Sequence, residues 1–362
     1  MPFWRELGKR VHEYDCKYIV QLAHGGRQRD LPGIEFGTGL SSTDKADPLH
    51  GFRCERATVG QLNEIASGFA DAAARVRDAE LDGVEIHGAN GYIFTQFLSS
   101  AINDRRDEYG GPLENRARFL LEVVRAIRDR VGEDFHLQVK ISATERNDAF
   151  IPWAGRGNTI DDSVRVCRWL EEAGVDAIHV SSGSSFPHPD NPAGSFPAKD
   201  FVAMYDVLLS SGIHTFRNYL AFKIWPLNRI LAARWARADD EIEGRNLADA
   251  RAIKQAVSIP VLCTGGFQTA SVIRGALAEG SCDAVTIARP LVANNDLVHL
   301  FAQGHERAPR PCSYCNKCLF NVLENPLGCY DERRFDSREE MIAQILSVYD
   351  PPPYVAHPEV MQ

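Results

Sequence analysis

The chain has 362 residues, 44% of them hydrophobic, so it can bury a large core either as one barrel or as two ordinary domains. Its formal net charge is -9, and Lys and Arg are spread among Asp and Glu, which leaves no basic stripe for a phosphate backbone and excludes nucleic acid as the expected partner. No apolar run reaches the roughly 18 residues that span a bilayer, and the charged, amphipathic start does not have the pattern of a signal peptide, so we expect a cytoplasmic protein with no membrane partner.

Short apolar segments alternate with longer amphipathic segments, a pattern that indicates parallel strands joined by crossover helices. We expect helices, in chain order, at 3–13, 58–79, 113–131, 160–173, 246–256 and 269–279. We expect strands at 18–22, 83–87, 137–142, 177–182, 260–266 and 284–290. Thr58 and Gln61 have the spacing of a capping box at the start of their helix. The fold class is therefore α/β, and in barrels of this class the site lies at the C-terminal strand ends.

Two stretches depart from this alternation. Residues 184–245 are too many for an ordinary connection and have some helical character of their own, and we interpret them as an elaborated loop beside the site. After about residue 292 the alternation stops. We therefore divide the chain into a β/α region, 1–292, and a cysteine-rich extension, 293–362, that packs on it and ends in a Pro-rich tail.

Polar side chains follow the expected strand at 83–87. His87 ends this strand, and Asn90 and Tyr92 lie in the loop after it, so two neutral hydrogen-bond donors and a phenol meet at a strand mouth. Such a trio can polarise a carbonyl oxygen and supply a proton. Taken alone, the same residues also fit a simpler role, with His87 capping a helix and Tyr92 packed as a half-buried aromatic.

The segment 83–127 resembles the Old Yellow Enzyme family, also called the NADH:flavin oxidoreductase family, through three successive motifs. These are H-G-A-N-G-Y, then N-x-R-x-D-x-Y-G-G at 103–111, then E-N-R-A-R-F at 114–119. The resemblance implies a TIM-type (β/α)8 barrel with FMN as cofactor. It implies that His87 and Asn90 hold the substrate's carbonyl or phenolate oxygen, and that Tyr92 donates a proton to the carbon opposite the hydride.

Two further strand ends extend the resemblance toward the flavin ring. QLAHGGR at 21–27 is similar to the family's Q-L-W-H-A-G-R, which implies that Gln21 meets the flavin pyrimidine ring and that His24 lies beside it. Ala23 replaces a bulky aromatic there, which predicts a wider pocket. Lys140 stands where the family usually has an arginine near the flavin, a change that keeps the charge that favours reduced flavin but loses the planar guanidinium fork.

The phosphate end of the site is expected at the last two strands. CTGGF at 263–267 and TIARPL at 286–291 are similar to the family's loops that hold the FMN phosphate through backbone N–H groups and an arginine. The resemblance assigns this role to Gly265, Gly266, Ala288 and Arg289. The two glycines also fit a tight turn, which is compatible with that role.

Four of the nine cysteines crowd into one segment with the spacing C-x2-C-x2-C-x10-C. The odd total and this crowding favour reduced thiols or a metal over a disulfide framework, and iron–sulfur clusters and structural zinc both accept four thiolates. The segment is similar to the cluster loop of 2,4-dienoyl-CoA reductases and trimethylamine dehydrogenases in this family, where a [4Fe-4S] centre passes electrons to FMN. A cluster here would need a separate reductase, and free thiols that close the loop are the alternative. The candidate ligands are Cys312, Cys315, Cys318 and Cys329; the other five cysteines, such as Cys167 and Cys263, are expected in the core.

Compared with the family, the chain starts at the helix before the third strand, so we expect an incomplete barrel of six strands instead of eight. A barrel without two strands has two unpaired edges, here on the strands 18–22 and 284–290. Inward apolar side chains such as Ile19 and Val285 should then be unusually exposed. Such edges favour pairing with another chain, including a second copy. Two explanations fit the missing strands. Either the start codon is set too far downstream, or the protein exists as a partial barrel.

The primary hypothesis is an FMN-dependent oxidoreductase that uses NAD(P)H to reduce an activated C=C in a small α,β-unsaturated carbonyl or enoyl compound. No separate Rossmann fingerprint is present, so nicotinamide and substrate would use one pocket in turn. One alternative is a non-catalytic remnant that binds little or no flavin. A further alternative is an amine dehydrogenase-like flavoprotein.

Overall fold

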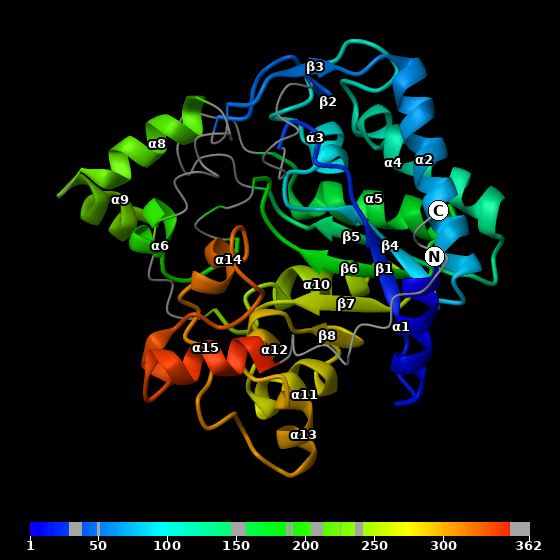
Figure 1. Ribbon diagram of the computed structural model, residues 1–362. Coiled ribbons are helices and arrows are strands. Elements are labelled where there is room, and N and C mark those ends of the chain that lie inside the picture. Colours follow the sequence, from blue (N-terminus) through cyan, green and yellow to red (C-terminus); the bar gives the residue numbers. More distant parts are fainter. Residues whose placement is uncertain are drawn as a thin grey trace, which may run out of the picture.

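Six parallel strands form the main sheet of the protein (Figure 1). The computed structural model describes residues 1–28, 38–48, 51–145, 157–185, 188, 191–203, 213–224, 226–235 and 242–347. The sheet has the order β1-β4-β5-β6-β7-β8 and is curled as an incomplete TIM barrel. Its strands are β1 (Ile19–Leu22), β4 (Gly83–Gly88), β5 (His136–Ser142), β6 (Ala177–Ser181), β7 (Val261–Thr264) and β8 (Ala284–Thr286). All six expected strands are therefore confirmed.

The six expected helices are also confirmed, each within two residues at either end. They are α1 (Pro2–His12), α2 (Val59–Asp78), α4 (Leu113–Val131), α5 (Ile160–Glu172), α10 (Leu247–Lys254) and α11 (Ala270–Ala278). The capping box at Thr58 is present, with the Thr58 hydroxyl accepting from the Gln61 backbone N–H and the Gln61 side chain accepting from Thr58.

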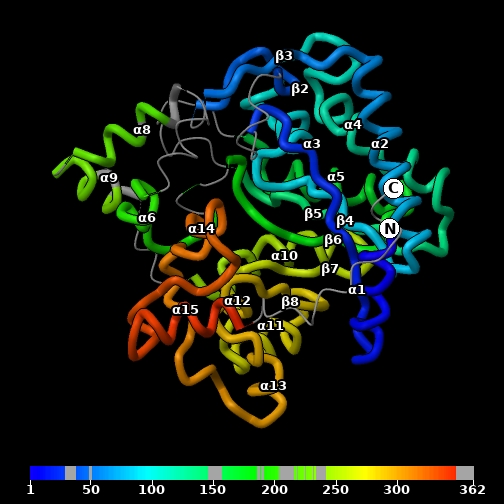
Figure 2. Tube along the Cα trace, in the orientation of Figure 1, coloured from blue at the N-terminus to red at the C-terminus, as the bar shows by residue number. Residues whose placement is uncertain are grey.

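Several short elements were not expected (Figure 2). A small parallel sheet pairs β2 (Gly39–Ser41) with β3 (Cys54–Arg56). The stretch 184–245 has the helical character that was expected, since its described residues include α6 (Ala198–Ala203), α8 (Ile213–Lys223) and α9 (Leu227–Trp235), although their bounds were not predicted. The remaining short helices are α3 (Ile93–Leu98), α12 (Arg289–Ala293), α13 (Leu297–Ala302), α14 (Lys317–Asn321), the 3-10 turn η1 (Glu332–Arg334) and α15 (Arg338–Ser347). The expected Pro-rich tail lies outside the described residues.

The expected strand 284–290 is too long, because β8 ends at Thr286 and α12 begins at Arg289. Pro290 stands in the first turn of α12, where its missing N–H costs nothing and its fixed φ favours a helix start. The chain therefore leaves the sheet just before the residues assigned to the phosphate site.

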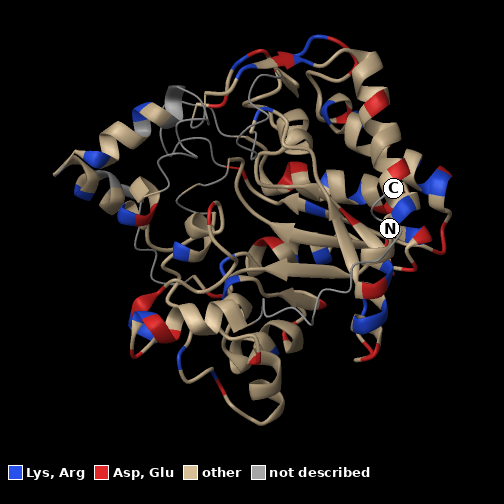
Figure 3. Cartoon of the chain, viewed as in Figure 1, with Lys and Arg blue, Asp and Glu red and all other residues tan. Residues whose placement is uncertain are grey.

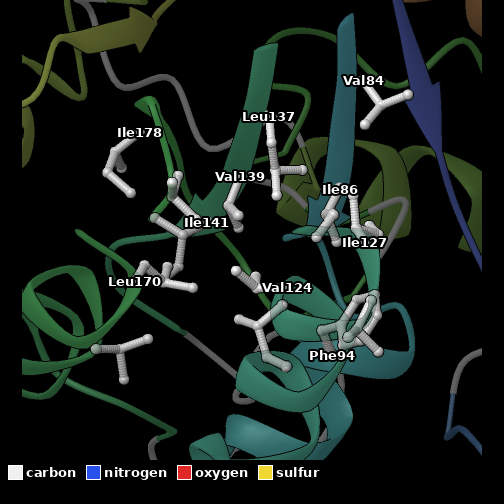
Figure 4. Packing of buried hydrophobic residues seen from close by; sticks show 14 of the residues in the cluster. Val84, Ile86, Phe94, Val124, Ile127, Leu137, Val139, Ile141, Leu170 and Ile178 are labelled. Atoms are coloured by element: carbon white, nitrogen blue, oxygen red, sulfur yellow. The ribbon is translucent and has the colours of Figure 1, made fainter. Parts of the chain in front are cut away.

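The main core lies between the outward face of the sheet and its helices (Figure 4). Alternate residues of the strands point to this side, and those at the centre of the sheet are fully buried. Val84, Ile86, Leu137, Val139 and Ile178 pack there against side chains from the covering helices, among them Phe94, Val124, Ile127 and Leu170. The opposite set of residues, including Glu85, His87 and Lys140, therefore faces inward.

The two outer strands each have one unpaired side within the described residues, as expected, because β1 pairs only with β4 and β8 only with β7. Ile19 is half-exposed, whereas the apolar residues of β4 are fully buried. Val285 was expected to point inward, and this was wrong. Its side chain is half-buried and packs on the outward core, and Thr286 faces inward instead. The two-residue alternation of a strand requires this once Cys263 and Val285 share a face.

Charges of both signs are intermingled along the chain (Figure 3), which agrees with the absence of a basic stripe in the sequence. Within the described residues, no helix is both long enough and apolar enough to cross a membrane. Cys167, Cys263 and Cys282 are buried as expected, but Cys16 is exposed and Cys54 is only half-buried. The expectation of a core position was wrong for Cys16, which lies in the polar turn between α1 and β1.

The contrast between central and outer strands predicts unequal mutational costs. Ile86→Ala should lower the free energy of unfolding by about 2–5 kcal/mol, because it empties a fully enclosed site. Ile19→Ala should cost about half of that or less, since Ile19 is already half-exposed. Urea titrations of both variants measure the difference, and equal losses would contradict the description of β1 as an outer strand.

Candidate functional site

The loop after β4 is held in a single conformation by two serines from neighbouring strands. The backbone N–H of Asn90 donates to the Ser142 hydroxyl at 2.9 Å. The Asn90 amide donates to the Ser181 hydroxyl at 3.2 Å and to the Ser182 carbonyl at 2.9 Å. Asn90 and the following Gly91 both have positive φ, and a Cβ on Gly91 would lie 2.2 Å from the Ser184 carbonyl oxygen. Only glycine fits there, so the motif H-G-A-N-G-Y has a backbone reason as well as a chemical one.

His87 and Tyr92, two of the predicted catalytic residues, are in contact. Their ring centroids are 4.7 Å apart in an edge-to-face arrangement, with His87 buried and Tyr92 half-buried. The Ala89 backbone N–H donates to His87 Nδ1 at 3.4 Å, so a neutral ring carries its proton on Nε2. Burial, aided by the charge of Lys140, lowers the pKa of His87 to about 3. His87 is therefore a neutral donor at ordinary pH.

Asn90, the third predicted catalytic residue, lies in the same loop, but its amide donors point to Ser181 and Ser182 of the β6 end. Holding a substrate oxygen would require at least one of these hydrogen bonds to be exchanged. The role of Asn90 toward substrate therefore stays a prediction, and its structural role in the loop is what the geometry gives directly.

Gln21, His24 and Lys140, the residues predicted for the flavin ring, lie at the same end of the sheet. Lys140 is paired in register with His87, and Gln21 with Glu85. Burial lowers the pKa of Lys140, while the charge of Glu85 opposes that shift. The Gly26 backbone N–H donates to His24 Nδ1 at 3.1 Å, and burial lowers the pKa of His24.

Gln96 was missed by the sequence analysis although it joins the two loops of the site. Its amide donates to the carbonyls of Gly25 at 3.2 Å and Gly91 at 2.8 Å, and its Oε1 accepts from the Arg27 backbone N–H at 3.1 Å. It is fully buried in α3. A polar residue inside the otherwise apolar segment IFTQFL was the available signal, because a buried amide needs partners.

The residues predicted for the phosphate lie at the ends of β7 and β8, where the carbonyl oxygens of the two glycines, rather than the N–H groups predicted to bind phosphate, have protein partners. The Gly265 carbonyl accepts from Gly244 N–H at 2.7 Å, and the Gly266 carbonyl accepts from the Tyr314 hydroxyl. Ala288 caps α12 without a side-chain hydrogen bond. The strand ends converge as predicted, and the phosphate role stays a prediction.

Arg289 lies between the phosphate loops and the cysteine segment. Its Nη1 donates to the Ala193 carbonyl at 2.7 Å and to Asn316 Oδ1 at 2.6 Å, and its guanidinium lies 5.2 Å from the Tyr314 ring centroid. Arg289 also lines a hollow that contains the predicted metal ligands. This arginine thus joins two parts of the chain that the sequence analysis treated separately.

The four clustered cysteines line that one hollow, so Cys329 is not remote from the other three. Arg334 Nη1 donates to Cys329 Sγ at 2.9 Å, and Ser313 donates to the carboxylate of Asp331 beside it. No group of three or more His, Cys, Asp or Glu side chains in the described ranges is arranged as a metal site. The cysteines therefore share a location, and their occupant stays a prediction.

Comparison with known proteins finds similarity between the chain and flavin oxidoreductases. A family model described as NADH:flavin oxidoreductase / NADH oxidase matches residues 1–204. The NADH oxidase of Thermoanaerobacter brockii is 30% identical over 343 residues, which cover 90% of this chain and 44% of that protein. The cinnamate reductase of Clostridium sporogenes is 27% identical over 333 residues, covering 88% of this chain and 43% of that protein.

A solved structure has the same fold. The complex of 2-naphthoyl-CoA reductase with 2-naphthoyl-CoA superimposes with a TM-score of 0.70 at 23% identity, covering 91% of this chain and 44% of that one. At this identity the likeness concerns the fold alone. In all three comparisons, the chain spans less than half the length of the protein it matches.

The buried, neutral state of His87 predicts a specific dependence of stability on pH. In the unfolded chain the pKa of His87 is 6.5, and in the folded protein it is about 3. Between these two pH values the unfolded state therefore binds more protons than the folded state. The stability due to neutral His87 is complete above pH 6.5 and is lost as the pH falls toward 3.

Thermal melts from pH 7 to pH 4 test this dependence. The His87→Gln variant should lose less stability than the original protein over that range, while His305→Gln, at an exposed histidine outside the site, should keep the original slope. Equal slopes for all three proteins would show that His87 is not a buried neutral histidine.

Proposed function

The chain belongs to the NADH:flavin oxidoreductase / NADH oxidase family, and from this we propose that it is an FMN-dependent oxidoreductase that uses NAD(P)H to reduce an activated C=C. The name of one similar protein, a cinnamate reductase, supports an acceptor with a C=C bond conjugated to a carbonyl. The observation that carries the proposal is the contact between a neutral His87 and the phenol of Tyr92 at the mouth of the sheet.

His87 and Tyr92 supply the two functions that this reaction needs from the protein. The Nε2–H of His87 is a neutral donor that can bind a carbonyl oxygen and favour negative charge on it as the conjugated bond is reduced. The Tyr92 hydroxyl can then give a proton to one carbon of the C=C while hydride reaches the other. Asn90 would add a second donor to the oxygen if it exchanged one of its serine-side partners.

Lys140 is the observation that supports a flavin in this site. It is a largely enclosed cation, and the described part of the chain gives it neither a hydrogen bond nor an ion pair, so an anionic ligand suits it. FMN, when bound, would supply the hydride chemistry, accepting a hydride from the nicotinamide and passing it to the acceptor. Gln21 and His24 would contact its ring, and Gly265, Gly266, Ala288 and Arg289 would hold its phosphate.

We further propose that Cys312, Cys315, Cys318 and Cys329 hold a [4Fe-4S] cluster, with zinc as the alternative occupant. The donor set fits in kind, because four thiols line one hollow and Arg334 donates a hydrogen bond to Cys329 Sγ, as neighbouring side chains do to the sulfur ligands of clusters. In this proposal residues 293–362 form an extension whose cluster receives electrons from a separate reductase and lies next to Arg289 of the flavin site.

The flavin proposal predicts how the Tyr92→Phe variant behaves. The purified chain should bind FMN and show its visible absorbance, and NAD(P)H should bleach it at the same rate in both proteins. Reoxidation by an α,β-unsaturated carbonyl compound should be about 10²- to 10⁴-fold slower in Tyr92→Phe, because the proton donor is gone. Stopped-flow absorbance measures both half-reactions.

The outcomes of this experiment separate the candidate functions. No retained FMN would favour the non-catalytic alternative, and bleaching by an amine in place of NAD(P)H would favour the amine dehydrogenase alternative. Equal reoxidation rates in the two proteins would leave FMN binding intact but contradict the role of Tyr92.

The cluster proposal predicts metal content. Anaerobically prepared protein should contain about four iron and four sulfide per chain. Cys318→Ser should reduce both strongly, whereas Cys16→Ser, at an exposed cysteine far from the hollow in sequence, should not. Iron and sulfide assays measure this, and zinc without sulfide would identify the alternative occupant.

A further inference from the structure

The inward face of the sheet carries a continuous line of hydrogen-bonded side chains that crosses every strand. Glu85 accepts from the amides of Gln21 and Gln138 and lies 2.7 Å from His179 Nδ1. On the other side of the ring, His179 Nε2 lies 2.8 Å from the Thr264 hydroxyl and 2.9 Å from the Thr286 hydroxyl. We call these six residues the inner belt: Gln21, Glu85, Gln138, His179, Thr264 and Thr286.

Glu85 is the only carboxylate of the inner belt and holds three of its other members. It is 6% exposed, so burial alone would raise its pKa. The hydrogen bonds from His179, Gln138 and Gln21, together with the charge attraction of His179, outweigh burial and lower the pKa of Glu85. Because the ionised carboxylate only accepts, the ring N–H of His179 at Nδ1 donates to it. The carboxylate therefore stays ionised and can only accept hydrogen bonds.

This restriction fixes the orientation of Gln21. A carboxylate cannot donate, so the Gln21 carboxamide can face Glu85 only with its NH₂ group. Its carbonyl oxygen, in the same plane but on the other side of the Cγ–Cδ bond, then points away from Glu85, and no described residue donates to it. Gln21 is exposed at the C-terminal end of β1, the same end as His87 and Lys140. The free group at this position is therefore an acceptor.

We propose that Glu85 is a positioning residue of the cofactor site, which turns the Gln21 carbonyl oxygen toward the ring N–H of the flavin pyrimidine. This inference rests on the proposed function. The pyrimidine edge of a flavin presents one N–H between two carbonyl oxygens, so a fixed acceptor matches the N–H and a freely turning amide does not. The attraction of Glu85 also opposes the loss of charge that burial imposes on Lys140.

Glu85→Gln is the direct test, because it keeps the shape of the side chain but lets it donate as well as accept. The probes are FMN and 3-methyl-FMN, whose methyl group replaces the ring N–H. The original protein should bind FMN at least about tenfold more tightly than 3-methyl-FMN. In Glu85→Gln the ratio of the two dissociation constants should fall toward one, because Gln21 is free to turn. Fluorescence titration of the apoprotein measures both constants without any turnover.

Thr286→Val is the matched control, since it breaks the far end of the inner belt without touching Glu85 or Gln21. It should keep the original binding ratio. A purely structural role for Glu85 would weaken the binding of both flavins equally in Glu85→Gln and leave the ratio of their dissociation constants at the original value. Should Glu85→Gln fail to fold, Gln21→Leu replaces it, because Gln21 is exposed. Removing its carboxamide should bring the ratio of the two dissociation constants toward one in the same way.

The outcomes separate this inference from the proposed function. A ratio that stays at the original value in Glu85→Gln, or in Gln21→Leu, overturns the inference while FMN binding still stands. An original protein that binds neither flavin overturns the proposed function and the inference together. A ratio lost in Glu85→Gln and Gln21→Leu but kept in Thr286→Val is the expected result.

Discussion

Parallel pairing of all six strands is the constraint on which the rest of the structure depends. Parallel neighbours cannot be joined by tight hairpins, so each connection crosses back over one face of the sheet, mostly as a helix. Two results follow from this. The outward face becomes the apolar core, and every strand delivers its last residue to the same edge. Residues as distant in sequence as His24 and Arg289 therefore lie at one edge without any direct signal between them.

The inward face has a different composition because it is not covered by helices. Each of the six strands contributes at least one polar side chain to it, and a polar group enclosed between strands is costly unless it has a partner. The inner belt meets this requirement by giving Glu85 three donors and His179 two hydroxyl partners. Lys140 lies next to His179 in register but outside these hydrogen bonds. The inward face thus carries the inner belt, whose side chains have hydrogen-bond partners, and beside it Lys140, which has none within the described residues. Lys140 is therefore the group suited to binding a ligand.

The sequence predicted the long elements well, because length and periodicity are what it records. The six strands and six long helices were located within a few residues, and the motif H-G-A-N-G-Y led directly to the contact between His87 and Tyr92. α3 was missed because all six of its residues are buried, so no polar face marks a helical period. β2 and β3 were missed because three residues are too few to show alternation.

The inner belt could not be predicted for another reason. The partners of Glu85 in β5 and β6 lie 53 and 94 residues away in sequence, so no local window contains them. The sequence does show a charged residue, Glu85, within the apolar strand GVEIH. A buried charge requires partners, but the sequence does not identify which residues they are. Arg289 is similar: its motif indicated a phosphate site, but only the fold shows that Asn316 and Ala193 reach it first.

The least supported part of the sheet carries one of the residues that the site requires. β1 pairs on one side only, and its residues are half-buried or exposed, so backbone pairing and core packing hold it less firmly than β4 or β5. Side chains fix it at both ends instead. The Asp82 carboxylate accepts from the Tyr18 backbone N–H at 2.7 Å, and Glu85 accepts from Gln21. Beyond the strand, the His24 carbonyl accepts from Ile93 N–H at 3.1 Å. Because these three contacts all lead to β4 or to the segments flanking it, the position of Gln21 follows that of β4, even though the other edge of β1 is unpaired within the described residues.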